Sequence, residues 1–272
     1  MHPIALDLGW QIRWYGILVA LGFLFGFWTA SRRAPLSGIH GEKVLDSGLW
    51  LLIGSIVGAR FLYVISYWDN LMANPLFPNA PWTEIFMVQR GGLVYYGGLI
   101  GASLACIAYC RVHKVLLFKF ADILTPSIAL GYVFGRLGCF MNGCCYGRVC
   151  DLPWAVRYPH QSDVWQQHFK MGIAEPNGAS APVHPTQIYD SLLNLGLYFG
   201  LSWLYRRKKF DGQVFAVYLL CYAIMRSFVE YFRGDYTAPH MHGGLTPAHL
   251  VSIGIFVTGI IFYVVLSRRQ KA

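Results

Sequence analysis

Arginine and glutamate side chains lie inside two stretches of the sequence that are otherwise apolar. Arg136 lies in GYVFGRLGCFMNG, and Arg226, Glu230 and Arg233 lie in VYLLCYAIMRSFVEYFRGD. Charges in segments that can enter a bilayer are costly, so they normally face a protein interior or a watery cavity and carry function. The planar guanidinium fork of arginine matches the oxygens of a phosphate group. These residues therefore predict a membrane-embedded site for an anion, with a phospholipid headgroup as the first candidate.

Each arginine also has a structural interpretation. Arg226 and Glu230 are four residues apart, so they could form an ion pair on one helix face that holds helices together. One glutamate cannot neutralise both Arg226 and Arg233, which favours the anion site. Arg136 could instead extend to the outer membrane interface. Arg60, in GSIVGARFLYV, has no obvious partner, and both interpretations stay open for it.

Four cysteines are grouped in one short stretch. Cys139, Cys144, Cys145 and Cys150 have the spacing C-x4-C-C-x4-C, which matches neither the usual zinc patterns nor a C-x-x-C redox motif. Ordinary packing, or a disulfide on the outer face, fits this spacing better than a metal. No metal site is therefore predicted.

The other polar residues carry weaker signals. His184 begins an apolar stretch in HPTQIYD, beside Gln187, Tyr189 and Asp190. The sequence contains no glycine-rich phosphate loop, no G-x-S-x-G and no H-E-x-x-H. His184 is therefore the one histidine kept as a candidate for substrate binding.

The composition is that of an integral membrane protein. Of the 272 residues, 56% are hydrophobic and only 13% are charged, against about 25% charged in soluble domains. The basic residues that give the net charge of +9 lie in short clusters between apolar segments, which indicates membrane topology and not a nucleic-acid partner. The N-terminus has no basic region and no cleavage site, so the first apolar run is predicted to be a retained span.

Seven apolar segments are long enough to cross a bilayer. Basic clusters follow the first, third, fifth and seventh, and such clusters face the cytoplasm. The sequence predicts an all-α, multi-pass membrane protein with its N-terminus outside and its C-terminus in the cytoplasm. Residues 139–185 are predicted to form a small external head within a single domain over residues 1–272. The predicted spans are Trp14–Ala30, Leu45–Ser66, Leu93–Cys110, Phe120–Gly138, Thr186–Tyr205, Val214–Phe232 and Pro247–Leu266.

Three pairs of glycines within these spans are four residues apart. This spacing allows two helix backbones to approach closely in lipid. The same glycines could also leave room for a lipid chain. The pairs are Gly54 and Gly58, Gly97 and Gly101, and Gly131 and Gly135.

Six segments together resemble the bacterial prolipoprotein diacylglyceryl transferases. They occur in the family's order and span nearly the whole chain. The combination of GRLGxFxNG with a later R-x3-E-x2-R is specific. The segments are RWYGILVALGF, VGARFLYV, RGGLVYYGGLIGA, GRLGCFMNGCCYGR, HPTQIYDSLL and MRSFVEYFRGD.

The resemblance implies an enzyme of the bacterial cytoplasmic (inner) membrane that carries out the first step of lipoprotein maturation. Such an enzyme moves the diacylglyceryl group of phosphatidylglycerol to the lipobox cysteine thiol of a preprolipoprotein. A thioether forms and glycerol phosphate is released. The expected partners are phosphatidylglycerol, preprolipoprotein signal peptides and membrane lipids, and no metal or cofactor is implied.

The resemblance also implies roles for individual residues. Arg136 and Arg226 would bind the headgroup phosphate, and Glu230 would orient Arg226 or the glycerol hydroxyls. Tyr96 stands where many family members have the histidine proposed as general base, and Cys139 stands where asparagine is common. An ordinary phenol is protonated at neutral pH, so Tyr96 is either a base activated by arginines or dispensable. The substrate site would be completed by Tyr15, Asn142, Gly147 and Arg233, with Arg60 and His184 as further candidates.

Two other classes of protein stay open. Apolar helices with buried charges also fit a lipid or solute transporter, although the paired halves typical of transporters are not seen. The second alternative is a membrane thiol oxidoreductase that uses the cysteines between positions 139 and 150. Serine replacement of all four cysteines would abolish an oxidoreductase and spare a transferase.

Overall fold

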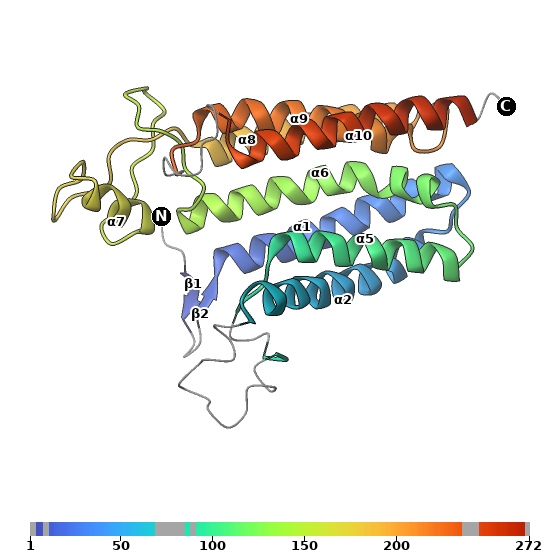
Figure 1. The fold of residues 1–272 in the computed structure, drawn as a ribbon, viewed down its shortest axis with the longest axis horizontal. Helices are drawn as coiled ribbons and strands as arrows, with labels where there is room; N and C mark the ends of the chain where they lie inside the picture. The colour runs from blue at the N-terminus through green and yellow to red at the C-terminus, as the bar shows by residue number, and fades with distance from the viewer. Residues whose placement is uncertain (1–3, 8–10, 69–84, 88–90, 236–244, 270–272) are drawn as a thin grey trace. The chain divides into compact units, whose positions relative to one another are not determined.

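The computed structural model describes residues 4–7, 11–68, 85–87, 91–235 and 245–269 (Figure 1). Within them the chain is α-helical apart from one antiparallel hairpin, isolated bridges and connecting loops. The elements are β1 (Ile4–Asp7), β2 (Gln11–Arg13), α1 (Trp14–Arg33), η1 (Ala34–Ser37), α2 (Gly41–Ser66), α5 (Tyr95–Val112), α6 (Leu117–Asn142), α7 (Asp163–Lys170), α8 (Thr186–Tyr205), α9 (Gln213–Phe232) and α10 (Pro247–Arg269).

The long helices of the described residues coincide with the seven predicted spans. Five of them, α1 with η1, α2, α6, α9 and α10, are long and apolar enough to cross a membrane. The helix α8 is equally long but carries buried polar side chains, which lower its mean hydropathy. This is the architecture of a multi-pass membrane protein.

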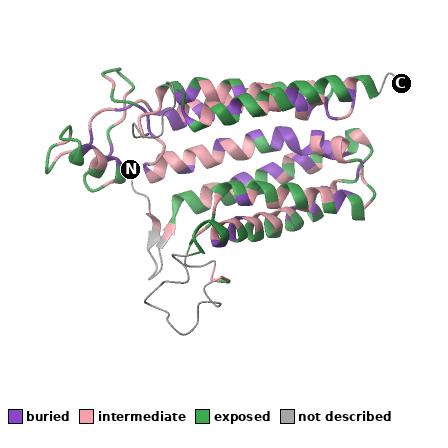
Figure 2. Cartoon of the chain, in the orientation of Figure 1, coloured by how far each residue is buried: buried purple, intermediate pink, exposed green. Residues whose placement is uncertain are grey.

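The helices expose large apolar side chains along their lengths. On α10, Val251, Ile253 and Ile261 are exposed, whereas Ser252 and Gly259 are buried. Figure 2 shows such exposed residues along the length of α10. An apolar surface of this extent is suited to lipid and not to water.

The described chain forms two compact units. One contains residues 1–30 and 121–272, and the other contains residues 31–120. The unit of residues 31–120 holds α2 and α5, and the other unit holds α6 to α10. That all 272 residues form a single domain stays a prediction.

In the unit of residues 31–120, α2 and α5 pack through glycines. A Cβ atom added to Gly101 would lie 2.1 Å from the carbonyl oxygen of Gly54, and one added to Gly58 would lie 2.3 Å from that of Gly97. No side chain fits at these positions, so the two backbones are in direct contact. The predicted packing role of these four glycines is confirmed.

In the other unit, α6 and α9 run side by side in the same direction. Near their starts, Asp122 of α6 accepts hydrogen bonds from the backbone N–H groups of Gly212, at 2.8 Å, and Phe215, at 3.0 Å. At their far ends, the N–H of Arg148 donates to the carbonyl of Phe232 at 2.8 Å. Asp122 thus caps the first turn of α9, whose N–H groups would otherwise be unpaired.

The connection between α6 and α8 forms a small cluster of its own. Tyr146, Tyr158, Val164 and Val183 are buried against one another, and the Ser162 side chain caps α7. The helix α6 continues through residues 139–142, so the connection itself begins one turn later than the predicted head. Its place outside the membrane stays a prediction.

Candidate functional site

Arg136 is held on α6 by a buried carboxylate of α8. Its Nε lies 2.7 Å from Oδ2 of Asp190, whose side chain is 3% exposed. The Tyr132 hydroxyl accepts a hydrogen bond from Nη2 of Arg136 at 2.6 Å and donates to Asp190 at 3.1 Å. The guanidinium of Arg136 is therefore fixed by contacts with the side chains of Tyr132 and Asp190. Its position relative to the membrane interface stays a prediction.

A second layer of polar groups fixes Asp190. The Nδ2 of Asn194 donates to Oδ1 of Asp190 at 3.1 Å, so both carboxylate oxygens have partners. The Ser191 hydroxyl ties the same helix to the Val133 carbonyl of α6 at 3.3 Å. In the part of the chain that the structure describes, Nη1 of Arg136 is left as a donor without a partner.

Arg226 is paired in the same way, with Glu230 one turn along α9. Nη1 of Arg226 lies 2.5 Å from Oε2 of Glu230, whose side chain is fully buried. The Thr246 hydroxyl donates to the other carboxylate oxygen at 2.7 Å and lies 3.0 Å from Nδ1 of His249. The predicted ion pair is confirmed, and its carboxylate is held from a second segment.

The two arginines lie at a similar level along their helices. The rings of Tyr132 and Tyr222 meet edge to face, 5.9 Å apart, and each tyrosine is four residues before its arginine. Because α6 and α9 run in the same direction, both guanidiniums lie about one turn beyond this contact, toward the same end. Each pair is neutral, so it offers a substrate oriented N–H donors and no excess charge.

Arg233 ends α9 at a junction of three segments. Its guanidinium binds Asp235 through Nε, at 2.9 Å, and Nη2, at 2.6 Å, and lies 3.9 Å from Glu230. Its backbone forms a bridge with Gly147. A Cβ atom on Gly147 would lie 2.5 Å from the Cβ of His184. The structure thus gives Gly147 a close-packing role beside Arg233.

His184 lies at the same junction. Its Nδ1 is 3.2 Å from the Tyr189 hydroxyl, and its ring packs 5.3 Å from that of Phe232. Burial lowers the pKa of His184 below its ordinary value, which favours the neutral form of the side chain. A neutral imidazole can exchange hydrogen bonds with a headgroup but cannot supply positive charge.

Tyr15 and Asn142 mark the edges of the site. Tyr15, on the first turn of α1, packs so closely on Gly138 that an added Cβ there would lie 3.0 Å from its ring. Its side chain is otherwise exposed. Asn142 is the last residue of α6. Tyr15 thus contacts α6 two residues after Arg136, and Asn142 follows Arg136 by six residues on the same helix.

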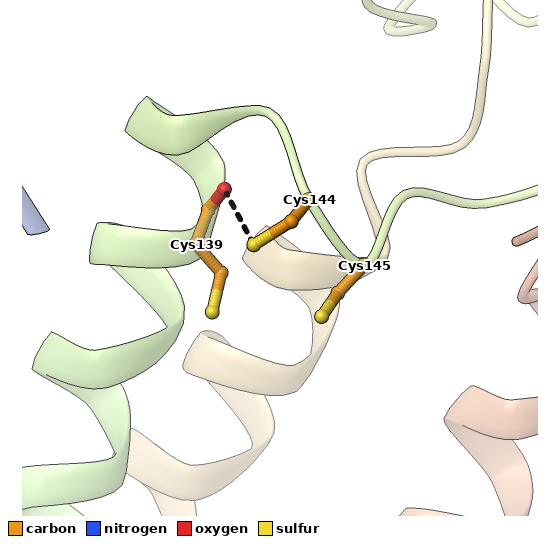
Figure 3. Close-up of side chains that lie close together, drawn as sticks. All are labelled: Cys139, Cys144 and Cys145. Atoms are coloured by element: carbon orange, nitrogen blue, oxygen red, sulfur yellow. Dashed lines mark hydrogen bonds between the residues drawn. The ribbon is translucent and has the colours of Figure 1, made fainter. Parts of the chain in front are cut away.

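Three of the four clustered cysteines lie together at this end of α6. The sulfur atoms of Cys139, Cys144 and Cys145 are within 4.8 Å of one another (Figure 3). All seven cysteines are free thiols, so the structure does not contain the disulfide that the sequence left open. Cys150 lies outside this group.

Arg60 and Tyr96 belong to the unit of residues 31–120. Arg60 is 8% exposed and donates to the carbonyls of Ile85, at 2.9 Å, and Gly91, at 2.7 Å. It therefore fixes the chain that leads into α5. Tyr96 is 55% exposed on the first turn of α5. Substrate binding by Arg60 and proton transfer by Tyr96 stay predictions.

Sequence reasoning missed the groups that hold Arg136. Asp190 was noted only as a neighbour of His184, and its partner Arg136 lies in the preceding predicted span. The signal was a single carboxylate inside an apolar stretch, which must find a cation or a watery cavity. Tyr132 and Asn194 carry no such signal, because tyrosine and asparagine occur in spans for many reasons.

Comparison with known proteins shows the family. Residues 3–265 match the family model described as prolipoprotein diacylglyceryl transferase. The chain belongs to this family. A relative from Finegoldia magna is 35% identical over 266 residues, which cover 97% of this chain and 95% of the relative. A relative from Clostridium tetani is 33% identical over 240 residues, and one from Vibrio cholerae is 33% identical over 270 residues.

The prolipoprotein diacylglyceryl transferase relatives cover most of this chain. The match spans 86% of both chains for Clostridium tetani, and 97% of this chain and 91% of the relative for Vibrio cholerae. All three relatives carry the name phosphatidylglycerol–prolipoprotein diacylglyceryl transferase. The family predicted from the sequence is confirmed, and it favours a transferase over a transporter or a thiol oxidoreductase.

Proposed function

We propose that this protein transfers the diacylglyceryl group of phosphatidylglycerol to the lipobox cysteine of preprolipoproteins in the bacterial inner membrane. The observation that carries the proposal is the pair of buried arginines at one level of α6 and α9, in a chain of this family. Each guanidinium is oriented by its own carboxylate. Such preorganised donors suit a phosphate ester whose charge grows during the reaction.

The reaction forms one bond and breaks one. The cysteine sulfur attacks the glyceryl carbon that carries the phosphate, and the carbon–oxygen bond breaks as the carbon–sulfur bond forms. The electron pair of the broken bond stays on the phosphate oxygen, so the phosphate group changes from one negative charge to two. The thiol proton passes to a base or to the released glycerol phosphate.

Arg136 and Arg226 would stabilise the growing charge on the phosphate. Asp190 and Glu230 hold the two guanidiniums before the substrate arrives, so little reorganisation is needed in the transition state. Arg233 would contribute a third guanidinium at the end of α9. Tyr15, Asn142, His184 and Arg60 are proposed to contact the headgroup or the glyceryl chain.

Tyr96 is proposed as the group that removes the thiol proton. Its side chain is exposed at the start of α5, where a base could meet an incoming peptide. If Tyr96 has no such role, the substrate's own phosphate is the remaining acceptor. The two possibilities differ in their dependence on the Tyr96 hydroxyl.

The proposed topology has seven spans, with the N-terminus outside and residues 139–185 in an external head. The last turns of α1 and α10 carry the basic residues Arg32, Arg33, Arg268 and Arg269. These residues support a cytoplasmic position for the C-terminal end of each of these two helices. This orientation places the far ends of α6 and α9, with the paired arginines, toward the side where exported precursors emerge.

The proposal is tested with the purified full-length protein. It is mixed with phosphatidylglycerol and a synthetic lipobox peptide, and the peptide is analysed by mass spectrometry. We expect a diacylglyceryl adduct on the cysteine together with an equal amount of glycerol phosphate. A peptide with serine in place of cysteine is the control. Peptide consumption without either product would contradict the proposal.

A further inference from the structure

A cluster of three thiols lies next to the arginine site but has no part in the proposed reaction. The sulfur atoms of Cys139, Cys144 and Cys145 lie within 4.8 Å of one another, and all three side chains are partly buried. Figure 3 shows them gathered between the end of α6 and the turn that follows it. Three sulfur ligands around one ion, each about 2.3 Å from it, would be about 4 Å apart. The thiols therefore need only small side-chain movements to share an ion.

The backbone holds the three cysteines in place. Cys139 belongs to α6, and its carbonyl accepts the N–H groups of Gly143, at 3.0 Å, and Cys144, at 3.2 Å. The first turn of α8 fixes the other two. Gln187 donates to the carbonyl of Cys144 at 2.7 Å, and Thr186 donates to that of Cys145 at 2.8 Å.

The backbone conformation of Cys145 is a second indication that the three thiols are preorganised. Its φ angle is +62°, a left-handed conformation that non-glycine residues rarely adopt. The hydrogen bond from Thr186 stabilises this turn and brings the Cys145 sulfur to the other two. A preformed set of ligands lowers the entropy that an ion must remove on binding.

We propose that Cys139, Cys144 and Cys145 bind one thiophilic metal ion, of the class of Cu(I) or Zn(II). Within the described residues the cluster offers sulfur ligands alone, with no histidine or carboxylate among them. Sulfur ligands select soft ions over Mg²⁺ or Ca²⁺. Each thiol loses its proton as its sulfur binds the ion, so binding releases up to three protons.

The charge of the loaded cluster connects it to the arginines. Three thiolates carry three negative charges, which leaves the site with a net charge of minus one with Zn(II) and minus two with Cu(I). Arg136 lies one turn before Cys139 on α6, and the backbone of Arg233 forms a bridge with Gly147, two residues after Cys145. A loaded cluster would compete with a phosphate for these guanidiniums and inhibit the transferase, a consequence that rests on the proposed function.

Metal binding is tested without reference to activity. Cys106 and Cys110 lie one turn apart on α5 and could bind the same ions, so both are replaced by serine in every protein compared. The full-length protein is kept reduced and free of oxygen, and is titrated with Cu(I) and with Zn(II) against a coloured chelator. We expect one ion per chain.

Matched cysteine variants decide whether the cluster is the site. Loss of a residue that only hydrogen-bonds to a metal ligand weakens metal sites by about 10–100-fold. Loss of a ligand itself should have a larger effect, so Cys139→Ser and Cys145→Ser should each weaken metal binding by about a hundredfold or more. Cys150→Ser and Cys221→Ser are the controls and should leave binding unchanged. Thermal unfolding of each variant shows that the bundle is intact.

Three results would overturn the proposal. They are binding that survives Cys139→Ser and Cys145→Ser, no binding tighter than that of a protein lacking all seven cysteines, and a disulfide within the cluster in protein isolated from membranes. The inhibition is examined separately, by adding the ion to the transfer assay. Inhibition that persists in Cys145→Ser would remove the link to the arginines while leaving the metal site in place.

Discussion

At the scale of single residues, each of the buried arginines Arg136 and Arg226 is paired with an acidic residue of its own. Asp190 binds Arg136 and Glu230 binds Arg226, and all four side chains are largely shielded from solvent. A buried ion pair contributes little net stability, but removing one partner leaves a costly unpaired charge. We therefore propose that the two pairs serve mainly to orient guanidinium donors.

The first prediction concerns the guanidinium fork. Arg136→Lys or Arg226→Lys keeps the charge but loses the bidentate donors, and each should lower turnover by about a hundredfold. Turnover is measured with phosphatidylglycerol and a lipobox peptide. Arg207→Lys, at an exposed position after α8, is the control and should be unaffected. Near-normal turnover of a folded Arg226→Lys protein would exclude this role.

The second prediction concerns Asp190 as a positioning residue. Asp190→Asn leaves the Arg136 charge unpaired in the bundle, which should cost about 3–5 kcal/mol of stability and lower kcat more than it raises KM. Asp190→Glu keeps the carboxylate and should recover part of the lost kcat. Stability is followed by thermal unfolding in detergent. If Asp190→Asn lost stability but kept its kcat, the residue would only support the fold.

The third prediction concerns Tyr96. If its hydroxyl removes the thiol proton, Tyr96→Phe should lose about a hundredfold or more in rate while still binding phospholipid. Tyr96→His should stay active with its pH optimum shifted downward, because imidazole titrates at about 6.5. A Tyr96→Phe enzyme with an unchanged pH–rate profile would show that the phosphate and the arginines suffice.

At the scale of elements, apolar length predicted every long helix but not its polar partners. The predicted span Phe120–Gly138 is shorter than α6, which runs to Asn142. Hydropathy places the end of a span at the first polar or glycine-rich stretch. The helix itself continues because its backbone hydrogen bonds continue, up to the bond from the N–H of Gly143 to the carbonyl of Cys139. The Arg136–Asp190 pair could not be predicted, since it depends on which helices are neighbours.

Asp122 shows the same limit at the start of α9. From the sequence it is an acidic residue near a helix start, yet in the structure it accepts the N–H groups of Gly212 and Phe215 and binds Lys208 at 2.9 Å. Burial lowers the pKa of Lys208, but hydrogen bonds to Asp211 and Asp122 raise it above its ordinary value. The raised pKa means that Lys208 stabilises the fold fully below about pH 10 and less at higher pH.

The fourth prediction tests this cap. Asp122→Ala removes a fully buried carboxylate and leaves two N–H groups and the Lys208 ammonium without their partner, so it should cost at least about 3 kcal/mol. Asp211→Ala removes a carboxylate that is 42% exposed, and should cost less than about 1 kcal/mol. Thermal unfolding of both variants in one detergent makes the comparison. Equal losses of stability in the two variants would show that Asp122 contributes no more to stability than the exposed Asp211.

At the scale of the whole molecule, the sequence was sufficient for the class and the family. Composition and basic clusters predicted a multi-pass membrane protein, and the motif around Arg136 together with that around Arg226 predicted the family that the comparisons confirm. The site was only partly predictable. The arginines carry their own signal as charges in apolar segments, whereas Tyr132 and Asn194 acquire their roles only through packing.

The fifth prediction concerns the topology. Single cysteines are placed at Arg206, Arg269 and Glu175 in a protein that otherwise lacks cysteine, and are labelled with a reagent that does not cross membranes. Intact cells should label position 175 alone, and positions 206 and 269 should react only after the membrane is opened. Labelling of position 206 in intact cells would reverse the proposed orientation and place the site on the wrong side for an exported substrate.

The central claim is that Arg136 and Arg226 share the phosphate of one phosphatidylglycerol molecule. The most direct measurement is a structure of the protein in lipid discs containing phosphatidylglycerol, with an Arg136→Ala and Arg226→Ala double variant for comparison. We predict headgroup phosphate density within hydrogen-bonding distance of both guanidiniums, and its loss in the variant. Phosphate density that lies away from both arginines, or that persists in the variant, would contradict the claim.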